Sequence, residues 1–161
     1  MRIRPYQASD LEDLKSMTVE AFDGVSIDQG IERQFGEMAG HDWRWRKGRH
    51  VDADVARDPA GVFVLEQEGR PVGYISTSCD PETGLGQIAN LVVIPELRGQ
   101  GWGRRLVLHA LDHFRRRGLS HAKIETLVQN DVGSALYRSV GFREVARQIH
   151  FVADLQTPDE G

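Results

Sequence analysis

Apolar and polar positions change their period several times along the 161-residue chain, and each change marks a new element. Residues 2–4 predict a short strand. An approximately helical stripe from Leu11 to Phe22 predicts the first helix, with Ser9 and Glu12 as its capping box. Between Ile27 and His50 the pattern is less regular, which predicts one or two short helices and a mobile connection.

Three runs of strand character follow the turn at residues 58–61. They span residues 62–66, 71–78 and 87–94, and turn sequences at Glu68-Gly69 and from Asp80 to Gly84 separate them. Short, turn-forming connections of this kind join neighbouring antiparallel strands. The middle of the chain is therefore predicted to be an antiparallel meander.

Helix and strand patterns then alternate. A helix is predicted from Arg104 to Gly118, a strand over residues 122–128, a short helix over 132–140 and a last strand through Val145, Ile149, Phe151 and Val152. Because a helix intervenes, the strand at 122–128 can run parallel to the strand at 87–94. The expected fold class is α+β, with a mixed sheet and helices on both faces.

Length and composition indicate one unit. A chain of 161 residues with 40% apolar residues suits a single core. We expect one domain over residues 1–155 and a frayed tail over residues 156–161. No repeat, low-complexity stretch or linker divides the sequence.

Charge and residue usage exclude several function classes. A net charge of −4 disfavours nucleic-acid binding. No segment approaches the roughly 20 apolar residues of a membrane span, and the amino terminus lacks a signal-peptide pattern, so we expect a cytoplasmic protein without a membrane partner. Cys79 is the only cysteine, and a small buried strand residue is a better interpretation than a catalytic thiol. The six histidines lack metal-ligand spacing, which predicts no metal.

The most informative stretch is Arg98-Gly99-Gln100-Gly101-Trp102-Gly103, between the apolar run at residues 91–95 and a helix. Glycines let backbone approach a ligand closely, and the first amides of a helix favour an anion. The loop therefore predicts a phosphate cradle. A Walker loop would need Lys-Ser or Lys-Thr after its last glycine, and a dinucleotide fingerprint would need G-x-G-x-x-G. Neither pattern is present.

The loop instead fits Arg/Gln-x-x-Gly-x-Gly/Ala through Arg98, Gly101 and Gly103. With the downstream segment 130–137 followed by Gly141-Phe142, it resembles the GNAT superfamily of acetyl-CoA-dependent N-acetyltransferases. The resemblance covers residues 85–151. It implies direct acetyl transfer from acetyl-CoA to a primary amine of a small molecule or a peptide N-terminus.

The resemblance also implies roles for individual residues. Backbone at Leu91, Val92 and Val93 would pair with the pantetheine arm, after the strands at 91 and 124 part at a bulge. Asn130 would contact the arm, and the Tyr137 hydroxyl would protonate the departing thiolate. The CoA pyrophosphate would be held by the loop residues Arg98, Gly99, Gln100, Gly101, Trp102, Gly103 and Arg104.

Several alternatives stay open. A catalytically silent acyl-CoA-binding or regulatory module would keep the loop without turnover, although Tyr137 favours an enzyme. Tyr137 itself could be a core aromatic. Trp43 and Trp45 either line an acceptor pocket or are one core and one surface residue. A nucleotide-linked oxidoreductase is disfavoured by the glycine spacing, and the assembly considered beside a monomer is a homodimer.

The proton acceptor is where the sequence departs from the family. Relatives often carry a glutamate on the strand before the loop, whereas residues 87–91 here contain no carboxylate. Glu20, Glu32 or Glu37 could replace it, although solvated helix surface is the simpler interpretation of each. Without a base the amine must arrive deprotonated, which predicts a preference for amines of low pKa.

Overall fold

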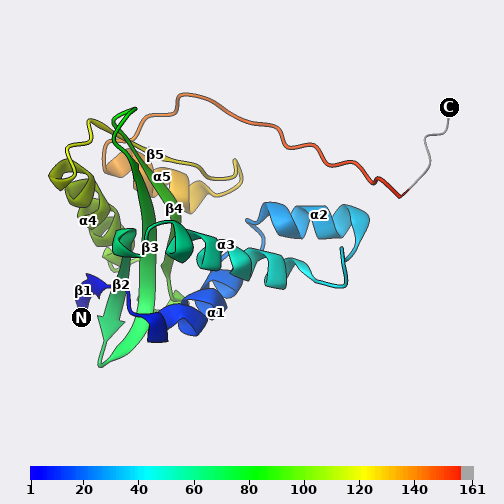
Figure 1. Cartoon of the computed structure of the whole chain (residues 1–161), viewed down its shortest axis with the longest axis horizontal. Helices are drawn as coiled ribbons and strands as arrows, with labels where there is room; N and C mark the ends of the chain where they lie inside the picture. The colour runs from blue at the N-terminus through cyan, green and yellow to red at the C-terminus, as the bar shows by residue number, and fades with distance from the viewer. Residues whose placement is uncertain (157–161) are drawn as a thin grey trace.

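A computed structural model describes residues 1–156 (Figure 1). Short 3₁₀ turns at Ala8–Asp10, Pro59–Gly61 and Pro95–Leu97 join some of its elements. In chain order the elements are β1 (Arg2–Pro5), α1 (Leu11–Ala21), α2 (Ile27–Phe35), α3 (Trp43–Arg57), β2 (Val62–Gln67), β3 (Arg70–Asp80), β4 (Leu85–Val93), α4 (Trp102–Arg116), β5 (His121–Ile124) and α5 (Asp131–Ser139).

The five strands form one sheet in the order β1-β2-β3-β4-β5. The first three pairings are antiparallel, and β5 joins β4 in parallel after the crossover through α4. Hairpin turns connect sequential neighbours, while a parallel neighbour needs a longer crossover. The predicted mixed sheet is confirmed.

The parallel pair is short, and it opens toward the end of β4. Register partners run from Leu85 with His121 to Ile88 with Ile124, although β4 continues to Val93. At the same point β4 carries an extra residue opposite β3, because Ser76 pairs with Asn90 and Thr77 with Ile88. A bulge of this kind bends a strand and increases its twist. The strands therefore part after Ile88, as the fold prediction required.

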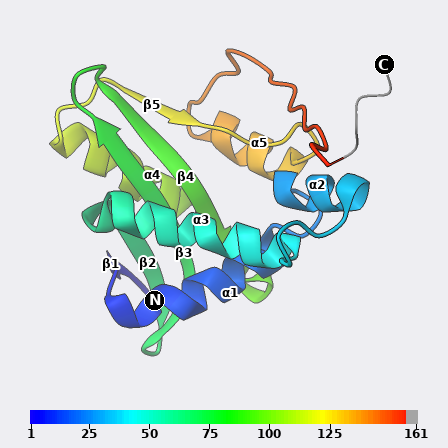
Figure 2. The same ribbon diagram turned by 45° about the vertical axis from the view of Figure 1, so that its right-hand side comes forward.

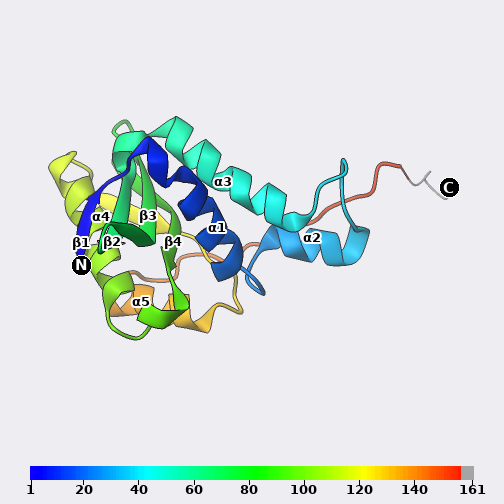
Figure 3. The ribbon, with the colours of Figure 1, turned by 90° about the horizontal axis from the view of Figure 1, so that it is seen from below.

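Helices cover both faces of the sheet, and each face has its own core. Figure 3 shows α1 and α3 on one face and α4 and α5 on the other, with α2 projecting from the body. Leu106, Val107 and Phe114 of α4 pack with Phe63 and Ile75 in one cluster. On the other face, the buried residues Leu14, Met17, Val51, Val62, Val64, Tyr74 and Val92 form the second cluster.

The start of the first helix differs from the prediction. Ser9 is exposed within a 3₁₀ turn, and Asp10 takes the role assigned to the Ser9–Glu12 pair. The Gln7 backbone N–H donates to Asp10 Oδ2 at 2.8 Å, and Arg4 binds both carboxylate oxygens at 2.8 Å. A carboxylate can accept all three bonds at once, which a hydroxyl cannot.

Two strand predictions need correction. β5 has four residues, because its pairing with β4 stops where the strands part. The last strand, predicted through residues 145–152, is absent from the part of the chain described, where these residues belong to none of the five strands of the sheet. The predicted tail lies outside the described residues from position 157 onward.

Candidate active site

The open edge of β4 leads directly into the glycine loop. Residues 89–93 continue β4 beyond its last register pair with β5, so on that side their backbone groups have no partner in the register. Such an edge can accept an extended chain by strand addition. Leu91 and Val93 are half-buried toward the α4 core, whereas Val92 is buried in the α1 and α3 core.

The loop places α4 with its first amides uncapped. Gly101 is the N-cap of α4 with φ 82°, and it has no side chain to accept the first helical N–H groups. Gly99 also has a positive φ, 74°. Both positions need the left-handed region that glycine occupies without strain. Gly103 serves packing instead, because a Cβ there would lie 3.3 Å from Leu136 of α5.

Two arginines of the motif hold the surrounding elements together. Arg98 Nε donates to the Val93 carbonyl at 3.1 Å and so ties the loop to the end of β4. Arg104 Nη1 donates to the Ser139 carbonyl at 3.0 Å, which links α4 to the end of α5. Both arginines are exposed, so their charge remains accessible to solvent. Gln100 Nε2 donates to the Glu96 carbonyl at 3.0 Å.

Asn130 has a structural role that the sequence did not indicate. It is the N-cap of α5, where its Oδ1 accepts the Gly133 N–H at 3.1 Å. Its Nδ2 donates to Thr126 Oγ1 at 2.8 Å. Asn is among the best N-cap residues for this reason. Contact between Asn130 and a CoA arm stays a prediction.

Tyr137 lies on α5 and packs against the same core as Leu91, Val93 and Trp102. Its ring meets Phe142 edge to face, with 6.2 Å between the centroids. Burial raises the pKa of the Tyr137 hydroxyl to about 12, because the phenolate would lose its hydration. The side chains of Tyr137, of the β4 edge and of the first residue of α4 thus pack against one apolar cluster.

A polar network on the opposite face was missed by sequence reasoning. Asp54 Oδ2 accepts from Ser76 Oγ and from Asn90 Nδ2, both at 2.6 Å. Asn90 Oδ1 in turn accepts from Lys47 Nζ at 3.2 Å. All four residues are buried, and burial lowers the pKa of Lys47. On α3 the buried residues include Trp43, Lys47, Val51 and Asp54, which recur every three or four positions. This helical spacing was the signal in the sequence that Lys47 and Asp54 lie on the buried face.

The exposure of the two tryptophans decides between the alternatives left open for them. Trp43 is 3% exposed and Trp45 is 44% exposed, so one is a core residue and the other a surface residue. Trp45 stacks on His41 and borders a hollow of about 370 Å³ between α1 and α3.

The candidate bases from the first half do not gather at β4. Glu32 accepts from the Trp43 backbone N–H and pairs with Arg46 at 3.8 Å. Glu20 lines a hollow between α1 and the start of β3, and Glu37 is exposed. Asp54 does reach the stretch 87–91, but the hydrogen bonds from Ser76 and Asn90 already engage its Oδ2.

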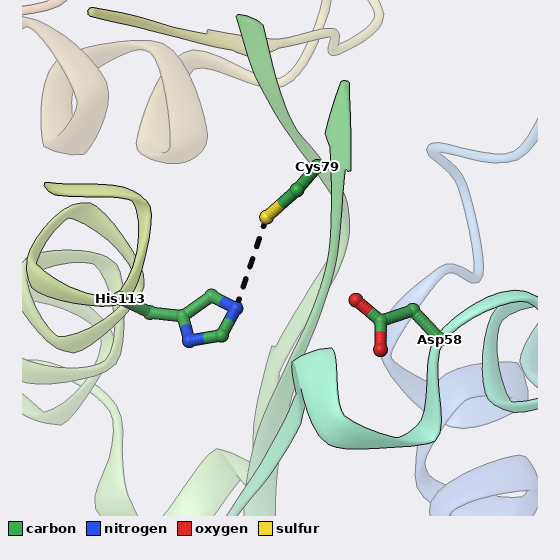
Figure 4. A group of neighbouring side chains, drawn as sticks. All are labelled: Asp58, Cys79 and His113. Atoms are coloured by element: carbon green, nitrogen blue, oxygen red, sulfur yellow. Dashed lines mark hydrogen bonds between the residues drawn. The ribbon is translucent and has the colours of Figure 1, made fainter. Parts of the chain in front are cut away.

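A separate cluster lies toward the other end of α4. Figure 4 shows Cys79 of β3 directed at the His113 ring of α4, with Asp58 coming from the turn after α3. Their potential ligand atoms lie within 4.8 Å of one another, and Cys79 Sγ is 3.8 Å from His113 Nε2. Because the three residues come from separate elements, spacing along the sequence could not reveal them. The absence of a metal stays a prediction.

Electrostatics argue against a reactive thiol in this cluster. Burial raises the pKa of the Cys79 thiol, while burial and then Arg117 lower the pKa of His113. Both shifts favour the neutral forms, whereas a nucleophilic pair needs thiolate and imidazolium. The neutral forms of Cys79 and His113 therefore fit a packing role for Cys79 better than a catalytic one.

The described part of the chain is thus an α+β fold whose mixed sheet opens beside a glycine loop and an uncapped helix. The model of the acetyltransferase (GNAT) family matches residues 25–142. The chain belongs to this family. None of the helices in residues 1–156 combines the length and apolarity needed to cross a membrane.

Individual relatives agree with this assignment. A mycothiol acetyltransferase from Thermomonospora curvata is 33% identical over 109 residues, which cover 68% of this chain and 36% of that protein. An uncharacterized N-acetyltransferase from Archaeoglobus fulgidus is 29% identical over 168 residues, covering 100% of this chain and 97% of the relative. The chain thus spans only about a third of the first relative's length.

Among solved structures, the PaiA N-acetyltransferase from Thermoplasma acidophilum in complex with coenzyme A superposes with a TM-score of 0.70. The two proteins are 20% identical, and the match covers 88% of this chain and 89% of the other. At this identity the likeness supports the fold alone.

Proposed function

We propose that this protein transfers an acetyl group from acetyl-CoA to a primary amine of a small molecule or a peptide N-terminus. The observation that carries the proposal is the continuity between the free edge of β4 and the uncapped amides at Gly101. An extended pantetheine chain fits such an edge, and a pyrophosphate fits such amides. Acetyl-CoA would supply the activated acyl group as a cosubstrate.

Backbone N–H groups on the free edge of β4 are suited to hold the thioester oxygen. Negative charge develops on that oxygen when an amine attacks, and fixed donors lower the energy of this state. A donor supplied by strand backbone is already oriented before the reaction. This role needs the strands to part, which they do after Ile88.

The raised pKa of Tyr137 changes the role expected from the family resemblance: its hydroxyl is suited to stabilise the departing sulfur by donating a hydrogen bond, not to protonate it completely. With a pKa near 12 its hydroxyl is a weaker acid than a thiol of pKa about 8.5, so complete proton transfer to the thiolate is unfavourable. A hydrogen bond to a charged group still contributes about 1.5–3 kcal/mol. The proton that the thiol finally carries is balanced by the one that the acceptor nitrogen loses.

The amine must lose a proton without an obvious protein base, since Asp54 is engaged by Ser76 and Asn90. At pH 7 an α-amine of pKa about 8 is roughly a tenth neutral, whereas a lysine-type amine of pKa about 10.4 is neutral in about one molecule in 2,500. We therefore predict higher kcat/KM for the α-amine. The measurement is kcat/KM against pH for one acceptor of each type.

That prediction would be wrong if both acceptors showed the same ionisation near pH 6 to 7 and one carboxylate or histidine substitution removed it. Such a result would identify a protein base. The proposed acetyl transfer would still stand.

Calorimetry and a turnover assay test the function itself. We expect the protein to bind acetyl-CoA and not NAD, and to release free thiol with some member of a panel of α-amino acids, peptides and alkylamines. Binding without thiol release for any amine would favour the silent acyl-CoA module. Failure to bind acetyl-CoA would exclude both hypotheses, the acetyltransferase and the silent acyl-CoA-binding module.

A further inference from the structure

The cluster of Asp58, Cys79 and His113 offers three ligand atoms of different kinds. A carboxylate oxygen, a sulfur and a ring nitrogen lie within 4.8 Å of one another. They come from a turn, a strand and a helix, as Figure 4 shows. The glycine loop, the β4 edge and the network around Asp54 use none of these side chains. The cluster therefore needs an explanation of its own.

The fold brings Asp58 and His113 together from opposite faces of the sheet. Helix α3, which leads into Asp58, and helix α4, which carries His113, lie on either side of the strands (Figure 2). Strand β3 continues past the start of β2, because its last pairing with β2 is at Ser76. The turn after Asp58 lies beside this end of β3, where Thr77 Oγ1 donates to the Gly61 carbonyl at 2.8 Å. Asp58 can therefore face the groups that α4 presents.

Packing holds the strand and the helix of the cluster in place. The buried His113 ring meets the Phe63 ring edge to face, with 5.1 Å between the centroids. Cys79 pairs with Gly86 of β4, and a Cβ on Gly86 would lie 2.5 Å from the Phe114 ring of α4. The helix therefore lies directly on these two strands. Ligand groups that are already ordered lose little conformational entropy on binding.

The Asp58 carboxylate is available to a cation. It is only partly exposed, and within residues 1–156 it accepts no hydrogen bond and forms no ion pair. A half-buried carboxylate without such a partner favours a positive charge beside it. The thiol and the imidazole lie on the side from which that charge would be shared.

The ligand set and its spacing fit zinc. Zn²⁺ binds Cys sulfur at about 2.3 Å and His nitrogen at about 2.0–2.1 Å in a tetrahedron, which puts these two atoms about 3.6 Å apart. Cys79 Sγ and His113 Nε2 are 3.8 Å apart. Mg²⁺ and Ca²⁺ prefer oxygen ligands, so a thiol beside an imidazole favours zinc over both.

We propose that Asp58, Cys79 and His113 bind one Zn²⁺ ion, with water in the fourth tetrahedral position. As the ion binds, the S–H bond of Cys79 breaks, a Zn–S bond forms and the proton passes to solvent, without any electron transfer. Thiolate and carboxylate together neutralise the charge of the ion. Burial, then Arg117, lower the pKa of His113, and the neutral ring that results is the form that coordinates a metal.

This proposal replaces the prediction of no metal, which considered only the spacing of histidines along the sequence. The ion would join the turn after α3, the end of β3 and the last turns of α4. It does not rest on the proposed acetyl transfer. His113 lies 11 residues after Trp102 on α4, about 17 Å along the helix from the glycine loop.

Metal titration of the untagged full chain, first freed of ions with a chelator, tests the site. We expect one Zn²⁺ per chain by calorimetry and a higher thermal midpoint with Zn²⁺, because only the folded chain assembles the three ligands. With Co²⁺ as a spectroscopic probe, we expect a thiolate-to-cobalt charge-transfer band in the near ultraviolet. A parent chain that binds no Zn²⁺, or a cobalt complex without this band, would overturn the proposal.

Ligand variants locate the ion. Cys79→Ala, His113→Gln and Asp58→Ala should each weaken Zn²⁺ binding at least about 100-fold, since losing an outer-shell partner alone costs roughly 10- to 100-fold. The matched control is His109→Gln, because His109 lies one helical turn before His113 and also contacts Phe63, but is outside the cluster. This control should bind Zn²⁺ as the parent does.

Urea denaturation without metal identifies the variants that fold. Weakening of less than about tenfold in any folded ligand variant, or equal weakening in His109→Gln, would exclude this site. The cobalt band is measured on the parent chain, so it decides the question even if a ligand variant does not fold.

Discussion

The two faces of the sheet are built by different means. On the α4 and α5 face the buried residues are mostly apolar, although His113 of α4 is buried beside Phe63. The candidate site for the acetyl donor, here called the donor site, consists of backbone at the ends of the elements that this core holds. On the α1 and α3 face, buried polar groups sit among the apolar ones: Thr18, Lys47, Asp54, Ser76 and Asn90. Backbone binding needs glycines at fixed spacing, whereas a side-chain network can be assembled from residues anywhere in the chain.

The largest expected effect is a loss of stability when the buried polar network is disrupted at Asp54. Asp54→Ala leaves the Ser76 hydroxyl and the Asn90 amide without their acceptor, and each orphaned buried donor costs about 1–3 kcal/mol. We expect the free energy of unfolding to fall by about 3 kcal/mol, measured by urea denaturation. Acetyl-CoA affinity of the folded variant should change little, because the donor site lies on the other side of β4.

Asp52→Ala is the matched control on the same helix. Asp52 is half exposed and pairs with Lys15 at 3.1 Å, and exposed pairs contribute at most about 1 kcal/mol. If Asp54→Ala and Asp52→Ala lowered the free energy of unfolding by the same amount, the buried network would not stabilise the fold.

The next effect on catalysis compares two tyrosines on opposite faces of the sheet, the partly buried Tyr137 and the fully buried Tyr74. Tyr137→Phe should lower kcat by about 10- to 100-fold, the weight of one hydrogen bond to a charged group, with acetyl-CoA affinity nearly unchanged. Tyr74→Phe removes a hydroxyl that bonds Thr18 Oγ1 at 2.6 Å, so it should reduce stability and spare kcat. The same outcome for both variants would indicate that Tyr137 only packs.

The difference between the two faces explains which parts of the fold and of the candidate site could be predicted from the sequence. The loop from Arg98 to Gly103 combines residues near in sequence, and its glycines have a direct conformational meaning, so the donor site was predictable. Lys47, Asp54 and Asn90 are separated by up to 43 positions, and their meeting depends on how α3 packs over the bulge in β4. The prediction of a C-terminal strand was wrong for another reason: an alternating apolar pattern does not determine whether a neighbouring strand pairs with it.

A smaller effect is expected from the backbone of the donor site. Gly101→Val places a branched residue at φ 82°, which strains the loop where backbone must approach phosphate. Acetyl-CoA should bind at least about tenfold more weakly, roughly 1.4 kcal/mol, by calorimetry. Gly69→Val is the control, because Gly69 has φ 80° in the β2–β3 hairpin, far along the chain from the loop. Unchanged affinity in folded Gly101→Val would remove the loop from the donor site.

The smallest effect concerns pH and the histidines that α4 carries into the apolar core. Burial lowers the pKa of His109 and His113, and Arg116 and Arg117 lower them further. Above an unfolded pKa of about 6.5 both states are neutral and folding costs nothing at these sites. As the pH falls through 6.5, the unfolded chain binds protons first, so stability declines until the lowered pKa values of the folded state are passed. Urea midpoints at several pH values between 7.5 and 5 should show a shallower decline for His113→Gln than for the parent chain. His150→Gln, at an exposed position, should follow the parent, and parallel curves for all three would show that His113 does not couple folding to pH.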